Sequence, residues 1–487
     1  INGIEAASNY YFGKTAADLT LPEGALLAAM LKSPNDYKPD DPANLERAKG
    51  RRDYVIQNMV GTYINQSEAD AAKATPIEVN ITHTPSGCEA NQVTAFFCDY
   101  TVWTIRNNVE FGANQEDREN LLRRGGLEIY TTLDLDVQKA ADKASKKWVP
   151  YDNKYGIGTA TVSVKAGTGE ILAMAENRIF DQTQSGKAGH TAVNYASDKA
   201  YGGSSGFQSG STYKIFTLAE WLKSGKKLED HVDARIREWN ATDFSSRCGT
   251  LAGTWKPKNS EKDPEDMSVV QATARSVNSA FAAMASQLDL CDIRDTAMAF
   301  GVHRADGNPL VFYPSSILGI NELSPLTMAA AVAAVSNHGV YCSPIAIKDV
   351  VVRKSQTHIP VPVSTCTTAV APEIAAGMTY AMQRVISGGT GSASATGDGT
   401  PLAGKTGTTD SGLQTWMTGF SSQVGTATWV GNPIGQQSLW SIRFNNKAAN
   451  TVRHDIWRTT MQEVNKLYPG AALDKPPADM IAATMMV

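Results

Sequence analysis

Ser211 and Lys214 stand three residues apart in Ser211-Thr-Tyr-Lys214, which follows Gly210 and precedes an apolar run. On a helix this separation brings the hydroxyl and the amine to one face. A serine becomes a nucleophile beside a base, and a lysine serves as that base when burial or a neighbouring cation keeps it neutral. In a first helical turn, the backbone N–H of the serine also points to where an oxyanion would form. The pair predicts acyl transfer, although Ser224-Gly-Lys-Lys227 matches the same pattern at an expected solvated helix end.

Two later motifs support this chemistry. Ser276-Val-Asn278 lies at an expected turn into or within a helix, and Lys405-Thr-Gly-Thr408 lies just before an expected strand at Trp416. Taken separately, the first is explained as a helix cap and the second as a glycine turn between strands. The three motifs rarely coincide by chance in this order and in these settings. Together they favour a serine nucleophile with a lysine base.

Two competing motifs lack the structural context that their chemistry requires. The segment from Gly399 to Thr406 matches the phosphate-binding pattern G-x-x-x-x-G-K-[ST], but a Gly/Ser/Thr-rich run precedes it and strand-like alternation follows it. A phosphate-binding loop needs a strand before it and a helix after it. Gly202-Gly-Ser-Ser-Gly206 matches the nucleophile elbow of esterases, but no apolar strand enters it. The histidines fit no matching frame, so a Ser-His-Asp mechanism has no support.

The elements around the motifs predict an α+β domain. Alternating residues predict a hairpin over 159–165 and 170–175, and later strands over 414–420, 425–431 and 437–444. Ala- and Met-rich segments between them predict helices over 270–288, 325–336 and 372–386. Strands at both ends of a domain with helices between them indicate an antiparallel sheet covered by helices.

The N-terminal third carries different signals. Pro22 and Glu23 predict the start of a helix that Pro34 ends, and a second helix is expected over 44–59. A strand is expected over 77–82, and a helix capped by Asp134 follows. With about three domains expected at this length, the predicted boundaries are a helical segment over 1–66, a small linker domain over 67–150, a main domain over 151–465 and a tail over 466–487.

Composition and cysteine usage limit the class of protein. The 45 Lys and Arg nearly balance the 49 Asp and Glu, so no basic surface indicates nucleic acid. No apolar run reaches the ~18 residues of a membrane span. The chain opens with Ile1, and we expect it to be part of a longer protein. No Cys or His cluster suits a metal, and the scattered cysteines favour disulfides and an oxidising compartment over six buried thiols. Nearest-neighbour pairing is our choice among the possible pairings: Cys88 with Cys98, Cys248 with Cys291, and Cys342 with Cys366.

The sequence resembles the transpeptidase domain of class A penicillin-binding proteins over about residues 125 to 460. The resemblance rests on the three motifs and on the runs that contain them or lie between them: Phe207-Gln-Ser-Gly-Ser-Thr-Tyr-Lys, Asn321-Glu-Leu-Ser-Pro-Leu-Thr-Met-Ala and Gly404-Lys-Thr-Gly-Thr-Thr. It implies the fold shared by penicillin-binding proteins and serine β-lactamases. Val277 suits the former, whereas class A β-lactamases carry Asp there. Ser209 stands where many relatives have Pro.

Upstream segments resemble the end of the glycosyltransferase domain of these bifunctional enzymes. They are Tyr11-Phe-Gly-Lys, Leu21-Pro-Glu-Gly-Ala-Leu-Leu-Ala and Ser33-Pro-Asn-Asp-Tyr-Lys-Pro. The two glutamates that polymerise glycan lie earlier in the family pattern, so we expect no glycosyltransferase activity from this part. The linker ending in Phe96-Phe-Cys-Asp-Tyr100 resembles that of actinobacterial members.

The resemblance also implies a role for each site residue. Ser211 would attack a D-Ala-D-Ala stem peptide, and Lys214 would take its proton. Ser276 and Asn278 would relay a proton to the leaving group and hold the substrate amide. The substrate carboxylate would be bound by the third motif, through Lys405, Thr406 and Gly407. The oxyanion would be bound by the backbone N–H groups of Ser211 and Thr408. No metal or organic cofactor is implied.

The implied partners are peptidoglycan stem peptides ending in D-Ala-D-Ala, β-lactam antibiotics, and proteins of cell-wall synthesis and division. The parent protein would be anchored in the bacterial cytoplasmic membrane, with this domain on its extracytoplasmic face. A D,D-carboxypeptidase or a β-lactamase with the same motifs is the main alternative, and a silent β-lactam sensor is another. A class A β-lactamase needs a glutamate to activate water. Glu322 is the nearest downstream candidate, but a helix cap is the preferred explanation of that residue.

Overall fold

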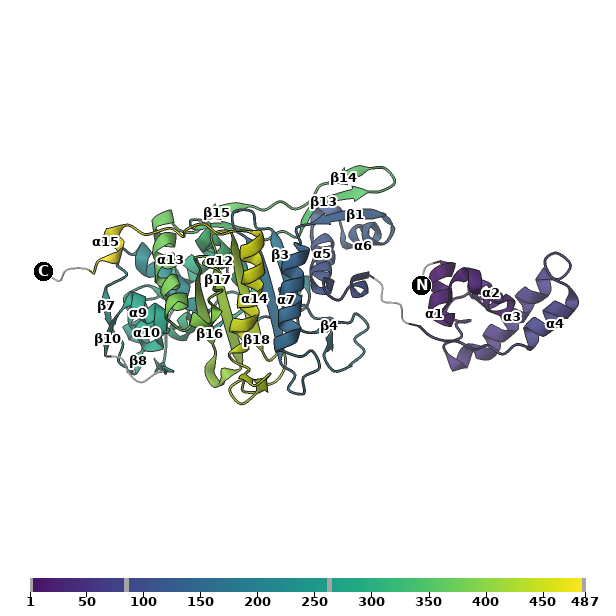
Figure 1. Cartoon of the computed structure of the whole chain (residues 1–487), viewed down its shortest axis with the longest axis horizontal. Helices are drawn as coiled ribbons and strands as arrows, with labels where there is room; N and C mark the ends of the chain where they lie inside the picture. Colours follow the sequence, from purple (N-terminus) through teal and green to yellow (C-terminus); the bar gives the residue numbers. More distant parts are fainter. Residues whose placement is uncertain (1–2, 83–86, 261–264, 484–487) are drawn as a thin grey trace. The chain divides into compact units, whose positions relative to one another are not determined.

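The computed structural model describes residues 3–82, 87–260 and 265–483. The chain forms two compact units, Ile1–Ala90 and Asn91–Val487 (Figure 1). All eight predicted site residues belong to the second unit. None of the described helices is long and apolar enough to cross a membrane.

The first unit is built from helices around two small apolar clusters. Its main helices are α1 (Ile4–Phe12), α2 (Leu21–Met30), α3 (Leu45–Met59) and α4 (Gln66–Ala74). The predicted start of α2 is confirmed, since Pro22 lies in its first turn and the Glu23 carboxylate accepts the backbone N–H of Thr20 at 2.8 Å. This reciprocal cap satisfies N–H groups that the first turn leaves without partners.

The strand predicted over residues 77–82 is wrong. The backbone N–H groups of Asn80 and Thr82 donate to the carbonyls of Tyr11 and Tyr10, each at 2.8 Å, at the end of α1. These N–H groups therefore bond to a helix end and not to a neighbouring strand. Ile77 and Val79 pack against the apolar cluster under α1 and α2, which explains the alternating pattern without a sheet.

The second unit contains the predicted antiparallel sheet. Its five strands lie in the order β16 (Ala403–Thr408), β17 (Gln414–Phe420), β18 (Val424–Gly431), β2 (Gly158–Lys165) and β3 (Ile171–Glu176), and every neighbouring pair is antiparallel. The hairpin β2–β3 from the start of the domain thus joins strands from its end. β16 is an edge strand, so one side of the Lys405 segment is open to a ligand.

The strand predicted over 437–444 is largely wrong. Only Arg443–Phe444 (β19) is extended, and it pairs with Lys447–Ala448 (β20) outside the main sheet. Leu439 and Ile442 are buried in an apolar cluster beside the end of β18. They anchor a loop, and their spacing resembled the alternation of a strand.

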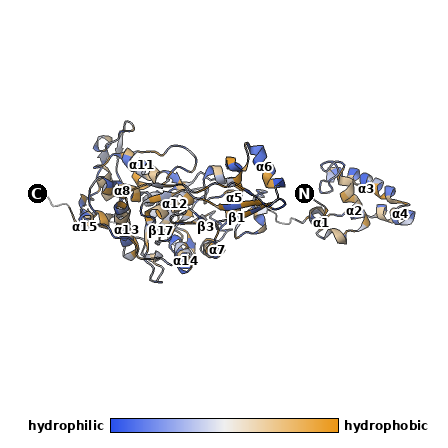
Figure 2. Cartoon of the chain, turned by 90° about the horizontal axis from the view of Figure 1, so that it is seen from above, coloured by the Kyte–Doolittle hydropathy of each residue, from blue (hydrophilic) through white to orange (hydrophobic). Residues whose placement is uncertain are grey.

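Helices cover both faces of the sheet (Figure 1). Along residues 173–175 of β3, side chains belong alternately to two apolar clusters, because successive strand side chains point to opposite faces. Ala173 and Ala175 pack with α7 (Leu135–Trp148) and α14 (Val452–Leu467), which lie side by side across the strands. Met174 faces the other cluster, which contains α12 (Pro325–Ser336), an almost wholly apolar helix in Figure 2.

The segment 91–150 is more helical than the sequence indicated. α5 (Ala95–Asn107) and α6 (Gln115–Arg124) precede β1 (Leu127–Thr131), which pairs with β13 (Ile347–Val352), itself paired with β14 (Thr357–Ile359). This segment belongs to the second compact unit, whereas residues 67–90 belong to the first. The predicted boundaries at 66/67 and 150/151 differ from this division, and they stay a prediction about functional domains.

Two predicted disulfides are confirmed, Cys248–Cys291 and Cys342–Cys366. Cys88 and Cys98 are also disulfide-bonded, and the described chain has no free cysteine. The second bridge joins the paired strands β12 (Val340–Cys342) and β15 (Cys366–Thr368). The alternative of six buried thiols is excluded in this structure.

Gly425 tests the contact between the sheet and α12. A Cβ at this position of β18 would lie 2.5 Å from the backbone nitrogen of Ala333 and 2.6 Å from the carbonyl oxygen of Ala329. Since backbone atoms must then move, Gly425→Ala is expected to destabilise the domain by about 2 kcal/mol, or to lower the melting temperature by about 5 °C. Thermal unfolding followed by circular dichroism measures the change. An unaltered melting temperature would show that the helix is not in close contact with β18.

Candidate active site

Ser211 and Lys214 lie on one continuous helical turn. Residues Gly210–Tyr213 (η6) form a 3₁₀ turn that runs directly into α8 (Lys214–Lys223). In a 3₁₀ turn, side chains three residues apart eclipse one another. Lys214 is fully buried and Ser211 is partly exposed, so the serine is accessible to a ligand while the lysine amine is shielded from water. Among the described residues, the Ser211 hydroxyl has no hydrogen-bond partner, which is common for a nucleophile without substrate.

Two glycines allow η6 to approach β16. A Cβ on Gly407 would lie 2.5 Å from the carbonyl oxygen of Ser209, and a Cβ on Gly210 would lie 2.9 Å from the backbone nitrogen of Thr408. Gly210 also has φ +55°, a conformation that glycine adopts without strain. The glycine of the Lys-Thr-Gly motif is therefore explained by close packing of strand against helix, and the alternative explanation, a glycine turn between strands, is excluded.

Ser276 interrupts the helix predicted over 270–288. α9 (Val269–Arg275) ends at Ser276, which has φ +58° and ψ +39°, and α10 (Asn278–Ala285) begins two residues later. The left-handed conformation is costly for a residue with a side chain and is found mainly where function requires it. Here it directs both the carbonyl and the hydroxyl of Ser276 toward Lys214, whose Nζ lies 2.6 Å and 3.3 Å from them.

The amine of Lys214 has two strong acceptors. Its Nζ donates to the Ser276 carbonyl and to Asn278 Oδ1, both at 2.6 Å. A neutral lysine has two N–H bonds and one lone pair. The two short contacts can use both hydrogens, and the 3.3 Å contact to Ser276 Oγ is the weakest of the three. The lone pair is then free to accept a proton from a hydroxyl.

Lys405 reaches the same serine from the sheet. It is fully buried, and its Nζ donates to Ser276 Oγ at 2.6 Å and to the carbonyl of Thr406 at 3.0 Å. The Ser276 hydroxyl thus lies between two lysines that come from different elements. The hydroxyl oxygen accepts a hydrogen bond from Lys405 and a longer one, at 3.3 Å, from Lys214.

Burial makes both lysines weakly basic. The pKa of Lys214 is held well below its ordinary value, mainly by burial and further by the nearby charge of Lys405. Burial, with a contribution from Arg453, lowers the pKa of Lys405 to about 7. No carboxylate pairs with either lysine among the described residues, so no opposite charge restores their basicity. Lys214 has the environment that a general base at neutral pH requires.

Asn278 is held by a loop that precedes it. Its Nδ2 donates to the carbonyl of Lys258 at 2.6 Å, and the next residue of the loop, Asn259, accepts the backbone N–H of Ser279 at 3.1 Å. These contacts fix the amide so that its oxygen faces Lys214 and its nitrogen faces the loop. The orientation follows because the amide nitrogen can only donate, here to a carbonyl, and the amide oxygen can only accept, here from the lysine.

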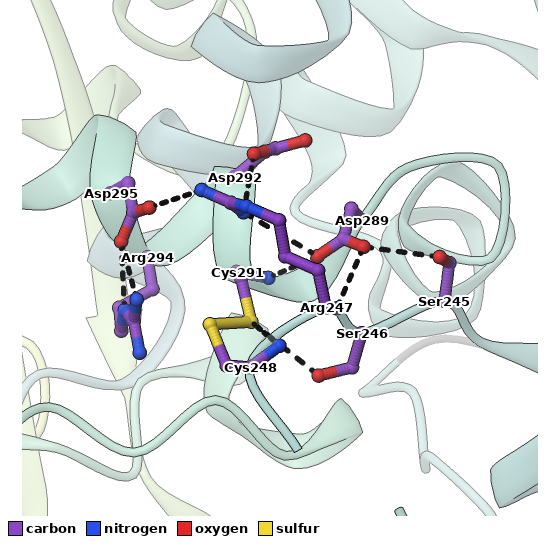
Figure 3. Close-up of a disulfide and its surroundings, with 9 residues drawn as sticks. All are labelled: Ser245, Ser246, Arg247, Cys248, Asp289, Cys291, Asp292, Arg294 and Asp295. Atoms are coloured by element: carbon purple, nitrogen blue, oxygen red, sulfur yellow. Dashed lines mark hydrogen bonds and ion pairs between the residues drawn. A yellow bond between two sulfur atoms is a disulfide. The ribbon is translucent and has the colours of Figure 1, made fainter. Parts of the chain in front are cut away.

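The loop before Lys258 is anchored by a disulfide (Figure 3). Cys248 in the loop is bonded to Cys291 in α11 (Leu290–Ala299). Beside it, Arg247 forms ion pairs at 2.5 to 3.9 Å with three carboxylates of or next to the same helix, Asp289, Asp292 and Asp295. The bridge and the ion pairs restrict the path by which the loop reaches Asn278.

The backbone of Thr408 faces the open edge of β16. Thr409 N–H donates to the carbonyl of Gln414 across the β16–β17 ladder, and Thr408 is paired with Thr415. Hydrogen-bonded and non-hydrogen-bonded pairs alternate in an antiparallel ladder, so the N–H of Thr408 points away from β17 and toward η6. The N–H of Thr408 therefore faces the turn that carries Ser211, as the expected oxyanion hole requires.

The structure excludes the context of the competing motifs. The Gly399–Thr406 segment runs into strand β16 and not into a helix, so it cannot hold phosphate in the manner of a nucleotide-binding loop. Gly202–Gly206 leads into no helix at Ser204. Glu322 lies in strand β11 (Glu322–Leu323) and forms an ion pair with Arg304 at 3.0 Å, whereas the cap of α12 is Ser324.

Comparison with known protein families agrees with this geometry. The model of the penicillin-binding protein transpeptidase domain matches residues 158–458, which include all three motifs. The chain belongs to this family. A transglycosylase model matches residues 1–60. The two matches together give the domain pair of class A penicillin-binding proteins.

Related proteins include two mycobacterial ones. Penicillin-binding protein 1A of Mycolicibacterium smegmatis is 28% identical over 94% of this chain, and that of Mycobacterium tuberculosis is 26% identical over 97%. The chain spans 56% and 55% of their lengths. The solved structure of PonA1 from M. tuberculosis has a TM-score of 0.64 at 22% identity, covering 80% of this chain and 97% of its own, which shows the shared fold.

Arg453 is a site residue that the sequence did not reveal. It lies in the first turn of α14, and its Nη1 donates to Thr408 Oγ1 at 3.3 Å. The motif set contains no arginine, and no predicted element covers residues 452–467. Its proximity to β16 follows from the way α14 crosses the sheet, which local patterns do not specify.

The burial of Lys405 predicts a pH-dependent stability. Below pH 7 both the folded and the unfolded protein are protonated at Lys405, and the folded state bears the full cost of the buried charge. Above pH 7 the folded state loses this proton while an unfolded lysine keeps it to about pH 10, so stability rises with pH. Between pH 7 and 9 the native chain should gain about 2 kcal/mol relative to Lys405→Met, measured by chemical denaturation. Parallel pH curves for the two proteins would contradict the low pKa.

Proposed function

We propose that this chain is a serine D,D-transpeptidase that cross-links peptidoglycan stem peptides through an acyl-enzyme on Ser211. The observation that carries the proposal is the position of the Lys214 amine: buried, eclipsed with Ser211, and hydrogen-bonded so that one lone pair remains. Family membership supports the same chemistry. The substrate would be a stem peptide that ends in D-Ala-D-Ala.

Acylation follows from the proton positions. Ser211 Oγ forms a bond to the carbonyl carbon of the penultimate D-Ala, and its proton passes to Lys214 Nζ. The two N–H groups of Ser211 and Thr408 stabilise the oxyanion. The C–N bond to the terminal D-Ala then breaks, and its amine receives a proton from the Ser276 hydroxyl. Ser276 is replenished from the lysines on either side of it, which lie at 3.3 Å and 2.6 Å.

The open edge of β16 suits an extended peptide. The backbone groups of Thr406 and Thr408 point away from β17, and an added strand could pair with them. Asn278 Nδ2 bonds to the Lys258 carbonyl at 2.6 Å, and it would exchange this contact for one with a substrate amide. These contacts would hold the scissile carbonyl against Ser211.

The second half of the reaction separates transpeptidation from hydrolysis. The amine of another stem peptide would attack the acyl carbon, with Lys214 or Ser276 taking its proton, and a peptide bond would replace the ester. A hydrolase would use water, which the β-lactamases activate with a glutamate. Among the described residues, no carboxylate contacts Ser211, Lys214 or Lys405. This favours a long-lived acyl-enzyme over a β-lactamase.

We further propose that the parent protein acts on the extracytoplasmic face of the bacterial cytoplasmic membrane, anchored by a segment outside this sequence. The disulfides support an oxidising compartment. Penicillin V is bound in a solved structure of the related PonA1, and β-lactams are the proposed inhibitors here. Proteins of cell-wall synthesis and division are the proposed partners.

Intact-mass spectrometry after incubation with benzylpenicillin tests the nucleophile. The native chain is expected to gain the mass of one penicillin, and Ser211→Ala is expected to gain none. Ser224→Ala is the matched control, because Ser224-Gly-Lys-Lys227 also fits the motif but ends α8 away from the other motifs. It should be labelled like the native chain. A native, folded chain that gains no mass would overturn the proposal.

A donor peptide ending in D-Ala-D-Ala distinguishes the remaining alternatives. Incubated with the enzyme and a diamino-acid acceptor, a transpeptidase forms a new amide in proportion to the acceptor. A carboxypeptidase releases D-Ala and forms only the shortened peptide. Loss of the penicillin adduct within seconds would instead identify a β-lactamase.

A further inference from the structure

Arg453 is a buried cation at the edge of the active site. Its side chain is 8% exposed, and Nη1 donates to Thr408 Oγ1 at 3.3 Å and to the carbonyl of Asn450 at 2.7 Å. Its Nε is buried and has no hydrogen-bond partner among the described residues. Thr408 is partly exposed and adjoins Gly210, the residue before the nucleophile. The guanidinium thus contacts Thr408, which in turn packs against the residue before the nucleophile.

No acidic group neutralises this arginine. Within the described chain, Arg453 takes part in no ion pair. Asp455 is close to it in sequence but binds Lys447 at 2.8 Å and Arg458 at 2.6 Å. The position is also unfavourable for a cation, because the N-terminal end of a helix carries a partial positive charge. A buried, unpaired guanidinium in a first helical turn lowers stability and therefore calls for a functional reason.

The site holds a cluster of cations that lacks an anion. Lys214, Lys405 and Arg453 are all buried. The charge of Lys405 contributes to the low pKa of Lys214, and the charge of Arg453 contributes to the low pKa of Lys405. Lys405 has a pKa of about 7, so it is only partly charged at neutral pH, and its Nζ is already bonded to Ser276 and Thr406. Burial lowers the pKa of Arg453 to about 10, which still leaves this arginine charged at neutral pH beside β16.

We propose that Arg453, together with the Thr408 hydroxyl, binds the terminal carboxylate of the D-Ala-D-Ala substrate and the equivalent carboxylate of β-lactams. The inference rests on the proposed function and assigns to Arg453 a role that the three motifs do not include. Both hydrogens of Nη1 have acceptors, while Nε and Nη2 remain as the planar pair that binds a carboxylate through two parallel hydrogen bonds. The incoming anion would satisfy the orphaned Nε and neutralise the cluster.

The assignment separates the tasks of the two neighbouring cations. Lys405 faces Ser276 and tunes proton transfer, whereas Arg453 faces Thr408 and recognises charge on the ligand. A lysine that must shuttle or share a proton is a poor permanent anchor for an anion. An arginine keeps its charge at every pH at which the enzyme would work.

The test compares a ligand with its carboxylate and without it. Rates of acylation by benzylpenicillin and by its methyl ester are measured by intact mass for the native chain, Arg453→Gln and Arg453→Lys. Losing a charged hydrogen-bonding partner is expected to slow acylation by the free acid roughly 10- to 100-fold. The ester, which carries no charge, should be slowed less than about threefold. Arg453→Lys should restore part of the rate with the free acid.

Arg458→Gln is the matched control. Arg458 lies on the same helix, but its guanidinium binds Asp455 at 2.6 Å and the carbonyl of Ala393 at 2.8 Å. This variant should acylate like the native chain with both ligands. Melting temperatures accompany each rate, and Arg453→Met provides an apolar replacement if Arg453→Gln unfolds.

The outcomes are distinct. Equal slowing of acid and ester in the Arg453 variants would mean that the arginine only maintains the structure, and the inference would be wrong. Unchanged rates with the free acid would also overturn it, while leaving the proposed function intact. If the native chain reacts with neither ligand, the proposed function itself fails.

Discussion

Two buried lysines that share one serine hydroxyl are the constraint on which the rest of this active site depends. Lys214 and Lys405 lie 3.3 Å and 2.6 Å from Ser276 Oγ. Two full charges at this separation in a buried site would repel strongly, so at least one amine must be neutral near pH 7. That requirement supplies a base beside Ser211 without any histidine or carboxylate. It also explains why the structure tolerates the unfavourable left-handed conformation of Ser276.

The fold satisfies this constraint by bringing three unrelated segments together. η6 carries the nucleophile, the break between α9 and α10 carries Ser276, and the edge strand β16 carries Lys405. Gly210 and Gly407 lack the Cβ atoms that would separate η6 from β16. The helices on both faces of the sheet exclude water from the amines, and burial is the first cause of both lowered pKa values. The packing that buries the two lysines is therefore also the main cause of their low pKa values.

The predictable part of this arrangement is local. Spacing alone indicated the pair Ser211 and Lys214, and the resemblance to a known family added Ser276, Asn278 and Lys405. The strand alternation of 159–175 and 414–431 predicted the sheet. The errors arose where apolar spacing served another purpose, as at Leu439, which anchors a loop. A turn into or within a helix was expected at Ser276, but its left-handed conformation was not, because local patterns do not show the tertiary contact to Lys214. Arg453 could not be predicted for the same reason, since only the crossing of α14 over the sheet brings it to Thr408.

The most direct test of the lysine pair is the pH dependence of acylation. The rate of penicillin acylation is measured from pH 4 to 9 for the native chain, Lys405→Met and Lys405→Arg. Acidification protonates Lys214 and stops the reaction, and the charge of Lys405 is one cause of the low pKa of Lys214. Removing that charge must raise the pKa, so the acidic limb of the Lys405→Met profile should move to higher pH, while Lys405→Arg should keep the native limb. An acidic limb at the same pH in all three proteins would show that Lys405 does not control the base, and would contradict the account.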